Sequence, residues 1–205
     1  MNKTATAGLC RLLVLGFLML PGALAVARDS PKLGSHKDWN GLDKVVIKEI
    51  FELTHYTLIQ VMPFDTKATP LPEKKDNTFE PVTEALQTFT TRLLAKMRSE
   101  LDGFKVESLE SDVTPSEAKA EALLIRGRVT EMNPGSEAAR FFGGFGAGHS
   151  RVEIECEVSD AQTGRVLVVM THARASSGSK GYDKILKQDT QDLGEDVATL
   201  LKSFK

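Results

Sequence analysis

A run of glycine and phenylalanine residues in the second half of the chain is the first place to look for chemistry, because glycine-rich loops can cradle phosphate groups. A nucleoside-triphosphate loop needs a lysine and a hydroxyl residue directly after its last glycine. Here Gly143 is followed five positions later by Gly148, but His149 stands where the lysine is needed. The spacing also differs from the dinucleotide fingerprint, and a strand pattern rather than a helix pattern follows it. We therefore predict no nucleotide and no other cofactor.

The same run has three other interpretations. Its glycines let another backbone approach closely. Its phenylalanines and flanking arginines are suited to contact with a partner or with a membrane interface. The third interpretation is that the run binds a small molecule. Because no catalytic group accompanies the run, we assign it as an interaction loop. This interaction loop consists of Arg140, Phe141, Phe142, Gly143, Gly144, Phe145, Gly146 and Gly148.

Metal-ligating residue types are present, but they are not spaced as metal sites. The histidines are far apart in the sequence, and neither a pair of histidines four residues apart nor a pair of cysteines three residues apart occurs. The sequence therefore predicts no metal site. The histidines are His36, His55, His149 and His172.

Nucleophilic catalysis has few candidates. Cys156 falls on the apolar face of an alternating strand pattern, which is typical of a small core residue. No serine lies in a G-x-S-x-G turn, and Asp160 begins a turn that its side chain is expected to cap. One enzyme alternative remains, a small hydrolase or ligand-binding enzyme whose site the fold assembles near His149, Asp160 and His172.

The N-terminus has the pattern of an export signal. A positively charged start precedes an apolar run from Leu12 to Leu20, and small residues follow. We therefore predict a signal peptide over residues 1–27, with cleavage after Ala25 or Ala27. The apolar run is too short to span a bilayer, which needs about 20 residues. We expect the mature protein to be periplasmic.

Charge and cysteine content restrict the partners. Cys10 precedes the apolar run instead of following it, so we expect no lipid anchor, although membrane contact remains an alternative. Removal of residues 1–27 takes the formal net charge from -2 to -4, which argues against a nucleic-acid partner. Cys156 then stands alone, so no internal disulfide is expected and the core must supply the stability.

Strand patterns occupy much of the rest of the chain. Residues 28–43 are polar and without periodicity, which predicts a loose leader before a single domain over residues 44–205. The residues from Val152 to Val158 alternate between apolar and glutamate side chains, a clear half-buried strand. Further strands are expected over residues 57–62, 104–109, 123–129 and 165–173.

Two stretches have the period of amphipathic helices. Apolar residues at steps of three or four from Phe79 to Leu101 predict a helix over about residues 78–102, ended at Gly103. A similar stripe from Tyr182 to Phe204 predicts a second helix over about residues 183–204. The fold class is therefore α+β, with a mixed, mostly antiparallel sheet of about four to six strands and both helices packed on one face.

Several motifs resemble those of a known family. Pro134–Ser136 with Ala139–Arg140, the run Gly143–Gly148, the strand ending at Asp160 before Thr163–Gly164, and the earlier Val61–Thr66 are similar to the DUF4410 family of bacterial envelope proteins. The resemblance covers roughly Thr57 to the C-terminus. It implies an α+β domain in the cell envelope, without an established activity.

Many members of that family resemble lipoproteins, whereas this chain lacks the lipobox cysteine. Taken with the export signal, the resemblance leads us to predict a non-enzymatic periplasmic envelope protein. We expect it to bind a partner protein or an envelope component, of unknown identity, through the interaction loop.

Overall fold

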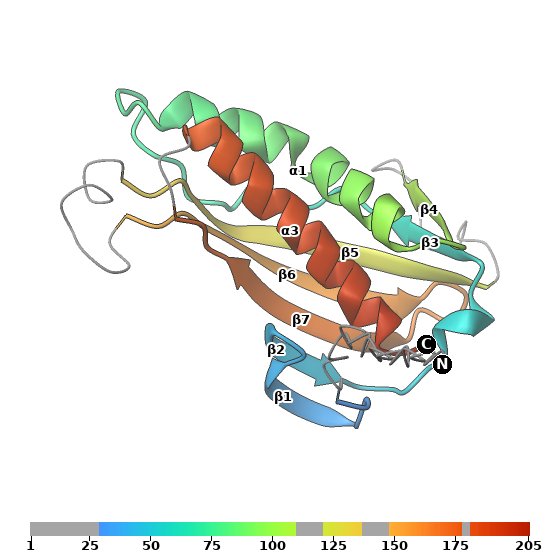
Figure 1. The fold of residues 1–205 in the computed structure, drawn as a ribbon. Coiled ribbons are helices and arrows are strands. Elements are labelled where there is room, and N and C mark those ends of the chain that lie inside the picture. Colours follow the sequence, from blue (N-terminus) through green and yellow to red (C-terminus); the bar gives the residue numbers. More distant parts are fainter. Residues whose placement is uncertain (1–28, 110–120, 137–147, 178–180) are drawn as a thin grey trace, which may run out of the picture.

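The computed structural model describes residues 29–109, 121–136, 148–177 and 181–205. These residues form a seven-stranded sheet with two long helices on one of its faces (Figure 1). The α+β class and the packing of both helices on one face are confirmed, and the sheet has seven strands where four to six were expected. The signal peptide predicted over residues 1–27 lies outside the described residues.

The sheet is mixed and has the strand order β1-β2-β7-β6-β5-β3-β4. Strand β3 runs parallel to β4 and β5, and every other neighbouring pair in this sheet is antiparallel. The strands are β1 (Gly34–Trp39), β2 (Leu42–Ile47), β3 (Leu58–Val61), β4 (Lys105–Ser108), β5 (Ala122–Asn133), β6 (Arg151–Asp160) and β7 (Val166–Arg174).

The central meander of β5, β6 and β7 follows the alternation in the sequence. The residues at 152, 154, 156 and 158 are buried against the helices, and the glutamates between them point to the opposite face. Strand β3 is buried along its whole length, as the sequence predicted for residues 57–62. The core therefore lies between one face of the sheet and the two helices.

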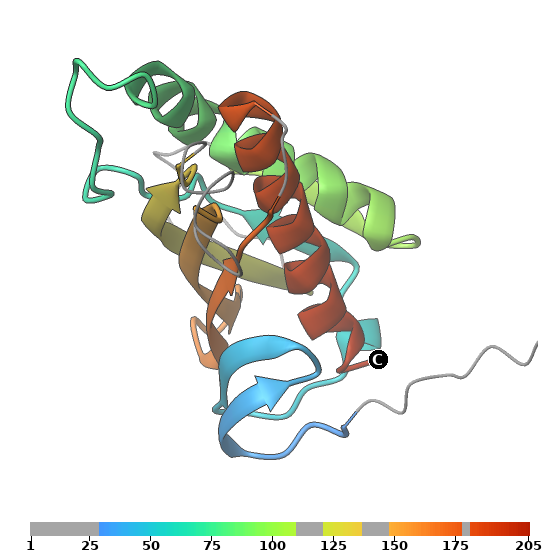
Figure 2. The ribbon, with the colours of Figure 1, turned by 60° about the vertical axis from the view of Figure 1, so that its left-hand side comes forward.

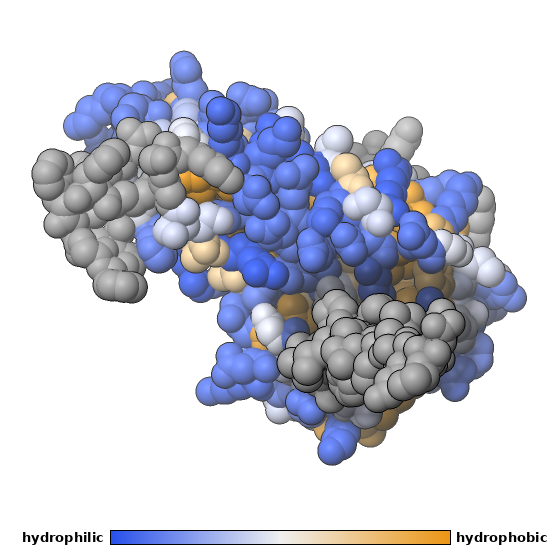
Figure 3. Space-filling model, viewed as in Figure 1, coloured by the Kyte–Doolittle hydropathy of each residue, from blue (hydrophilic) through white to orange (hydrophobic). Residues whose placement is uncertain are grey.

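The two helices bury the stripes that the sequence predicted. Helix α1 (Phe79–Glu100) turns Phe89, Leu93 and Met97 towards the sheet, and helix α3 (Tyr182–Lys202) packs beside it. Gly103 takes a φ of 91° just beyond α1, which suits the left-handed cap position. The outward surface of both helices is mainly hydrophilic (Figure 3), as expected for amphipathic helices.

Helices α1 and α3 approach each other closely at Gly194. A Cβ atom added to Gly194 would lie 2.6 Å from the backbone oxygen of Leu93, so no larger residue fits without separating the helices. Ion pairs flank this crossing, because Lys96 contacts Glu195 at 3.0 Å and Lys202 contacts Glu100 at 3.0 Å. The small residue sets the helix spacing that the core requires.

The N-terminal hairpin corrects the prediction of a loose leader over residues 28–43. Strand β1 pairs with β2, and Trp39 is buried opposite Leu42. Between them, Asn40 and Gly41 have φ values of 53° and 85°, the positive angles that a two-residue hairpin turn requires. The Asn-Gly pair was the signal for this hairpin, and the polar strand that precedes it hid the pattern.

The C-terminus packs against this N-terminal hairpin. Phe204 stacks on Phe51 with ring centroids 4.3 Å apart and lies 6.2 Å from the ring of Trp39. Its backbone oxygen accepts a hydrogen bond from Leu53, the first residue of the short 3-10 helix η1 (Leu53–His55). Figure 2 shows the end of α3 beside the hairpin and η1. The two ends of the described chain therefore close the same end of the core.

Candidate functional site

A closed stem, formed by residues 133–136 and 148–151, lies on either side of residues 137–147 in the sequence. Asn133 on β5 pairs with Arg151 on β6, and the Asn133 side chain accepts a hydrogen bond from the Gly135 N–H at 2.8 Å. Gly135 has a φ of 75°, and an added Cβ atom would lie 2.1 Å from the backbone oxygen of Gly148. Residues 133–135 therefore form a tight turn, and only glycine fits where the two chain segments touch.

Most of the predicted interaction loop lies outside the described residues. Arg140, Phe141, Phe142, Gly143, Gly144, Phe145 and Gly146 belong to the range 137–147, whereas Gly148 lies in the stem. The described stem therefore fixes where the loop leaves the sheet.

A groove of about 840 Å³ lies beside this stem. One wall comes from the segment that leads into α1, where Leu71 is 52% exposed between two prolines. The opposite wall comes from the end of β5 and from the stem residues Gly148 and His149. No role was predicted from the sequence for residues 70–72. The apolar residues that line the groove are Pro70, Leu71, Pro72, Met132 and Pro134.

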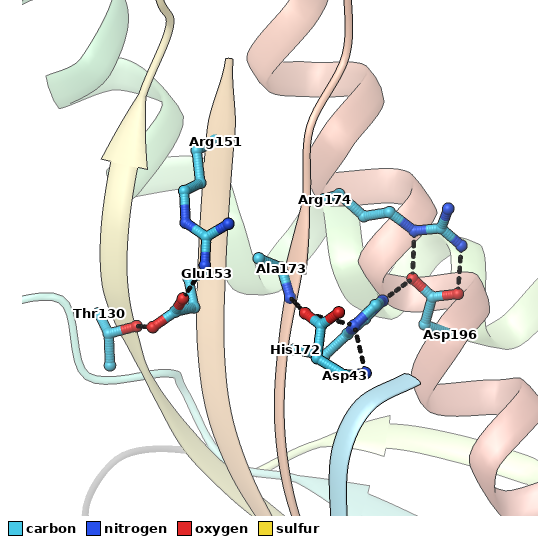
Figure 4. Close-up of polar contacts among 8 residues, drawn as sticks. All are labelled: Asp43, Thr130, Arg151, Glu153, His172, Ala173, Arg174 and Asp196. Atoms are coloured by element: carbon cyan, nitrogen blue, oxygen red, sulfur yellow. Dashed lines mark hydrogen bonds and ion pairs between the residues drawn. The ribbon is translucent and has the colours of Figure 1, made fainter. Parts of the chain in front are cut away.

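Polar side chains at the rim of the groove bind one another. Arg151 contacts Glu131 at 2.9 Å and also pairs with Glu153, which accepts a hydrogen bond from the Thr130 hydroxyl at 2.9 Å (Figure 4). The hydrogen bond to Glu153 raises the pKa of Arg151. Thr130 sits where the register of β5 and β6 shifts. Arg151 thus binds both rim carboxylates and compensates one of their two negative charges.

The same pairing continues along the outer face of the sheet. Arg128 contacts Glu155 at 2.6 Å, and Arg126 contacts Glu157 at 2.5 Å. The alternation predicted a half-buried strand, and the glutamates of β6 lie on this outer face. The arginines of β5 already occupy these glutamates, so the face presents little uncompensated negative charge.

A buried carboxylate lies beneath the stem. Asp189 on α3 is fully buried and accepts hydrogen bonds from the hydroxyls of Ser150 and Ser176, each at 2.5 Å. The two serines also bind each other, because the Ser176 N–H donates to Ser150 Oγ at 2.9 Å. Ser150 precedes β6 and Ser176 follows β7, so Asp189 joins both strand ends to the helix. The sequence analysis did not identify this cluster.

A second polar cluster links β7 to α3 and to the N-terminal hairpin. His172 is buried, with Nε2 3.0 Å from Asp196 and Nδ1 3.1 Å from an Asp43 carboxylate oxygen (Figure 4). Arg174 binds Asp196 through two nitrogens. Burial alone disfavours ionisation of Asp196, but the hydrogen bonds from His172 and Arg174 outweigh it and lower its pKa. Both ring nitrogens of His172 face aspartates, and neither is aimed at a serine or cysteine nucleophile.

The residues of the enzyme alternative do not form one site. His149 is exposed at the groove, and His172 is buried between α3 and the hairpin. Asp160, at the far end of β6, accepts hydrogen bonds from Thr163 and from the Tyr56 hydroxyl. These bonds confirm the turn-capping role predicted for Asp160. No hydrogen bond joins any two of these three described residues, which the hydrolase alternative required.

Cys156, the remaining candidate for nucleophilic catalysis, is a core residue. Cys156 is buried, as predicted, and burial raises the pKa of its thiol to about 12, which disfavours the reactive thiolate. Within the described ranges, no three histidine, cysteine or acidic residues are grouped as metal ligands. Among the helices of those same ranges, none is both long and apolar enough to cross a bilayer.

Comparison with known proteins gives one family. The model of a domain of unknown function, DUF4410, matches residues 59–177, which is more than half of the chain. No curated protein matches.

Three solved structures are similar to the chain at low sequence identity. The PelC dodecamer from Paraburkholderia phytofirmans has 15% identity and a TM-score of 0.45, covering 73% of this chain and 94% of that one. Lipoprotein GNA1162 from Neisseria meningitidis has 12% identity and a TM-score of 0.40, covering 70% and 99%. The hypothetical protein CT253 from Chlamydia trachomatis has 11% identity and a TM-score of 0.45, covering 72% and 97%.

Proposed function

The chain belongs to the DUF4410 family, and we propose that it is a non-enzymatic periplasmic protein of the cell envelope. In this proposal it binds a partner protein or envelope component through the interaction loop and the groove beside its stem. The N-terminal export pattern over residues 1–27 supports the location.

The observation that carries the proposal is the groove beside the closed stem, with an apolar wall at Pro70, Leu71 and Pro72. Three prolines are pre-ordered in their backbone and lose little entropy on binding. With Leu71 half exposed between two of them, the wall offers apolar area that a partner can cover. Gly148 belongs to both the interaction loop and the groove, so we expect one partner to contact both.

The arrangement of polar groups supports a binding role over a catalytic one. The rim carboxylates of Glu131 and Glu153 are bound to Arg151. The histidine at the groove, His149, is paired with no acid or nucleophile among the described residues, and the buried pair of His172 and Asp196 is closed to substrates. A surface of this kind supplies shape and apolar contact rather than proton transfer.

Site-specific photocrosslinking in cells tests the proposal. A photoreactive amino acid replaces Leu71 in one variant and Phe145 in another. Leu33 serves as the matched control, because it is a large apolar residue with 64% exposure that precedes β1, at the end of the sheet away from the groove. We expect the same crosslinked partner from Leu71 and Phe145 and none from Leu33. Absence of an adduct at both test positions, or equal capture at Leu33, contradicts the proposal.

A further inference from the structure

The carboxylate of Asp189 is connected to the groove through a short chain of contacts. Its bond to Ser150 fixes the residue that directly follows His149. The backbone oxygens of Gly148 and His149 lie against Gly135, and all three residues line the groove. A displacement of Ser150 therefore moves the groove wall on the stem side.

The number of serine hydroxyls that Asp189 can accept depends on its charge. As a carboxylate it accepts from Ser150 through one oxygen and from Ser176 through the other. After protonation one oxygen carries a hydrogen and becomes a donor, so that serine must rotate its hydroxyl or move away. The charge-assisted bonds are also about twice as strong as neutral ones.

We propose that Asp189 is a positioning residue of the groove whose ionisation holds the stem-side wall in place and whose protonation loosens it. As a carboxylate, Asp189 ties the strand ends at Ser150 and Ser176 to α3, and protonation releases one of the two. The part of the proposal in which protonation regulates partner binding rests on the proposed function. The geometry of the groove can be measured without a partner.

The surroundings of Asp189 raise its pKa above that of an exposed aspartate. Burial raises the pKa of Asp189, and the bonds from Ser150 and Ser176 only partly oppose this. Asp192 on the same helix raises the pKa further, and Arg174 on β7 lowers it. Arg174 is itself bound to Asp196, so its charge is shared.

The sign of this shift separates a positioning role from a purely structural one. A raised carboxyl pKa means that this group contributes most to stability below its unfolded pKa and loses that contribution as the pH rises through the folded pKa. When the pH falls through the folded pKa, Asp189 is protonated and the free-energy cost of burying its charge disappears. In the proposal, the same protonation loosens the stem. If Asp189 served stability alone, the groove would not become less ordered at low pH, where the contribution of Asp189 to stability is largest.

Distance measurement between two spin labels tests the proposal directly. The labels are attached at Leu71→Cys and His149→Cys, one on each wall of the groove, in the full chain with Cys10→Ser. Cys156 is buried and stays in place. The distance distribution is recorded by pulsed electron paramagnetic resonance from pH 8 to pH 4. Labelling position 149 also removes the imidazole of His149 from the groove.

We expect a narrow distribution at high pH that broadens as Asp189 is protonated. Asp189→Asn should give the broad distribution at every pH. Ser150→Ala removes the bond that ties the stem to Asp189 and should also give the broad distribution at every pH. The control, Asp192→Asn, removes a repelling charge that touches neither serine, and should move the midpoint to lower pH with both end states unchanged.

Three results overturn the proposal. They are a pH-independent distribution in the parent protein, a parent-like pH response in Asp189→Asn or in Ser150→Ala, and a midpoint of Asp192→Asn that does not move to lower pH. If Asp189→Asn does not fold, the broad distribution of Ser150→Ala and the lower midpoint of Asp192→Asn decide the question. Failure here leaves the crosslinking result untouched, and absence of crosslinks leaves the pH response untouched, so the two proposals fail separately.

Discussion

The guanidinium of Arg174 on β7 donates two hydrogen bonds to the carboxylate of Asp196 on α3 (Figure 4). The same carboxylate faces Nε2 of the buried His172. Helix α3 is therefore held to the sheet by polar contacts as well as by its apolar stripe, and each kind of contact can be tested separately.

Substitution of Asp196 should weaken the fold in a pH-dependent way. Asp196→Asn removes a largely buried charge and should lower the free energy of unfolding by about 2 kcal/mol at pH 7. The pKa of Asp196 is lowered, so its contribution is present above the unfolded value of about 3.9 and is lost as the pH falls through the folded value. Urea unfolding at pH 7 and at pH 3 should show the variant and the parent converging in acid. Asp192→Asn is the control on the same helix and should not show this convergence.

The close crossing of α1 and α3 predicts a steric cost at Gly194. Gly194→Ala gains about 1 kcal/mol of helix propensity, but its Cβ atom collides with the Leu93 backbone oxygen. We expect a net loss of about 1–2 kcal/mol in urea unfolding, because backbone atoms cannot move aside as side chains do. Gly181→Ala, at the start of α3 with no atom within 4 Å, should be nearly neutral. Equal effects at both positions would show that the helix spacing is adjustable.

The stem of the interaction loop predicts a contrast between two glycines with positive φ. Gly135→Ala and Gly164→Ala share the left-handed backbone cost of about 1 kcal/mol, since their φ values are 75° and 69°. Only Gly135 also touches Gly148. We expect Gly135→Ala to be the more destabilising variant by at least about 1 kcal/mol and to raise amide exchange at residues 148–150. If the two variants unfold alike, the stem is not packed as described.

The pair of Tyr56 and Asp160 predicts an anomalous tyrosine titration. Burial, with help from the hydrogen bond to Asp160 at 3.0 Å, raises the pKa of Tyr56 to about 12. In a Tyr182→Phe background, ultraviolet titration should report Tyr56 alone with a midpoint near that value. Because the pKa is raised, this contribution to stability is complete below about pH 10 and is lost as the pH rises towards 12.

The role of Asp160 in that titration has its own check. Asp160→Asn removes the charge but not the burial, which is the larger cause. The Tyr56 midpoint should fall part of the way towards its ordinary value. A midpoint that did not move would place the whole effect in burial.

The parts of the fold that the sequence predicted are those fixed by local periodicity. The stripes of α1 and α3 and the alternation of β6 each identify their own buried face. The cap at Asp160 depends on Thr163, only three positions away. Local patterns of this kind can be recognised in the sequence without knowledge of the rest of the chain.

The clusters that were missed join residues distant in sequence. Ser150, Ser176 and Asp189 meet only because β6, β7 and α3 pack together, and no spacing rule connects them. One signal was present: Asp189 lies on the stripe of α3 between Leu186 and Leu193, where an apolar residue is expected. A carboxylate at such a position must find donors in the folded protein.

The pairing of the N-terminal hairpin with β7 has a consequence for how the chain folds. The β5–β6–β7 meander closes through contacts local in sequence, but β2 must wait until β7 exists, because Lys44 lies opposite Thr171. During that interval the backbone groups of β2 that will pair with β7 stay open to other chains. Charged residues on an open edge oppose such pairing, and this hairpin carries Lys37, Asp38, Asp43 and Lys44. The polar residues that made this hairpin hard to predict from the sequence thus protect the chain from aggregation before β2 pairs with β7.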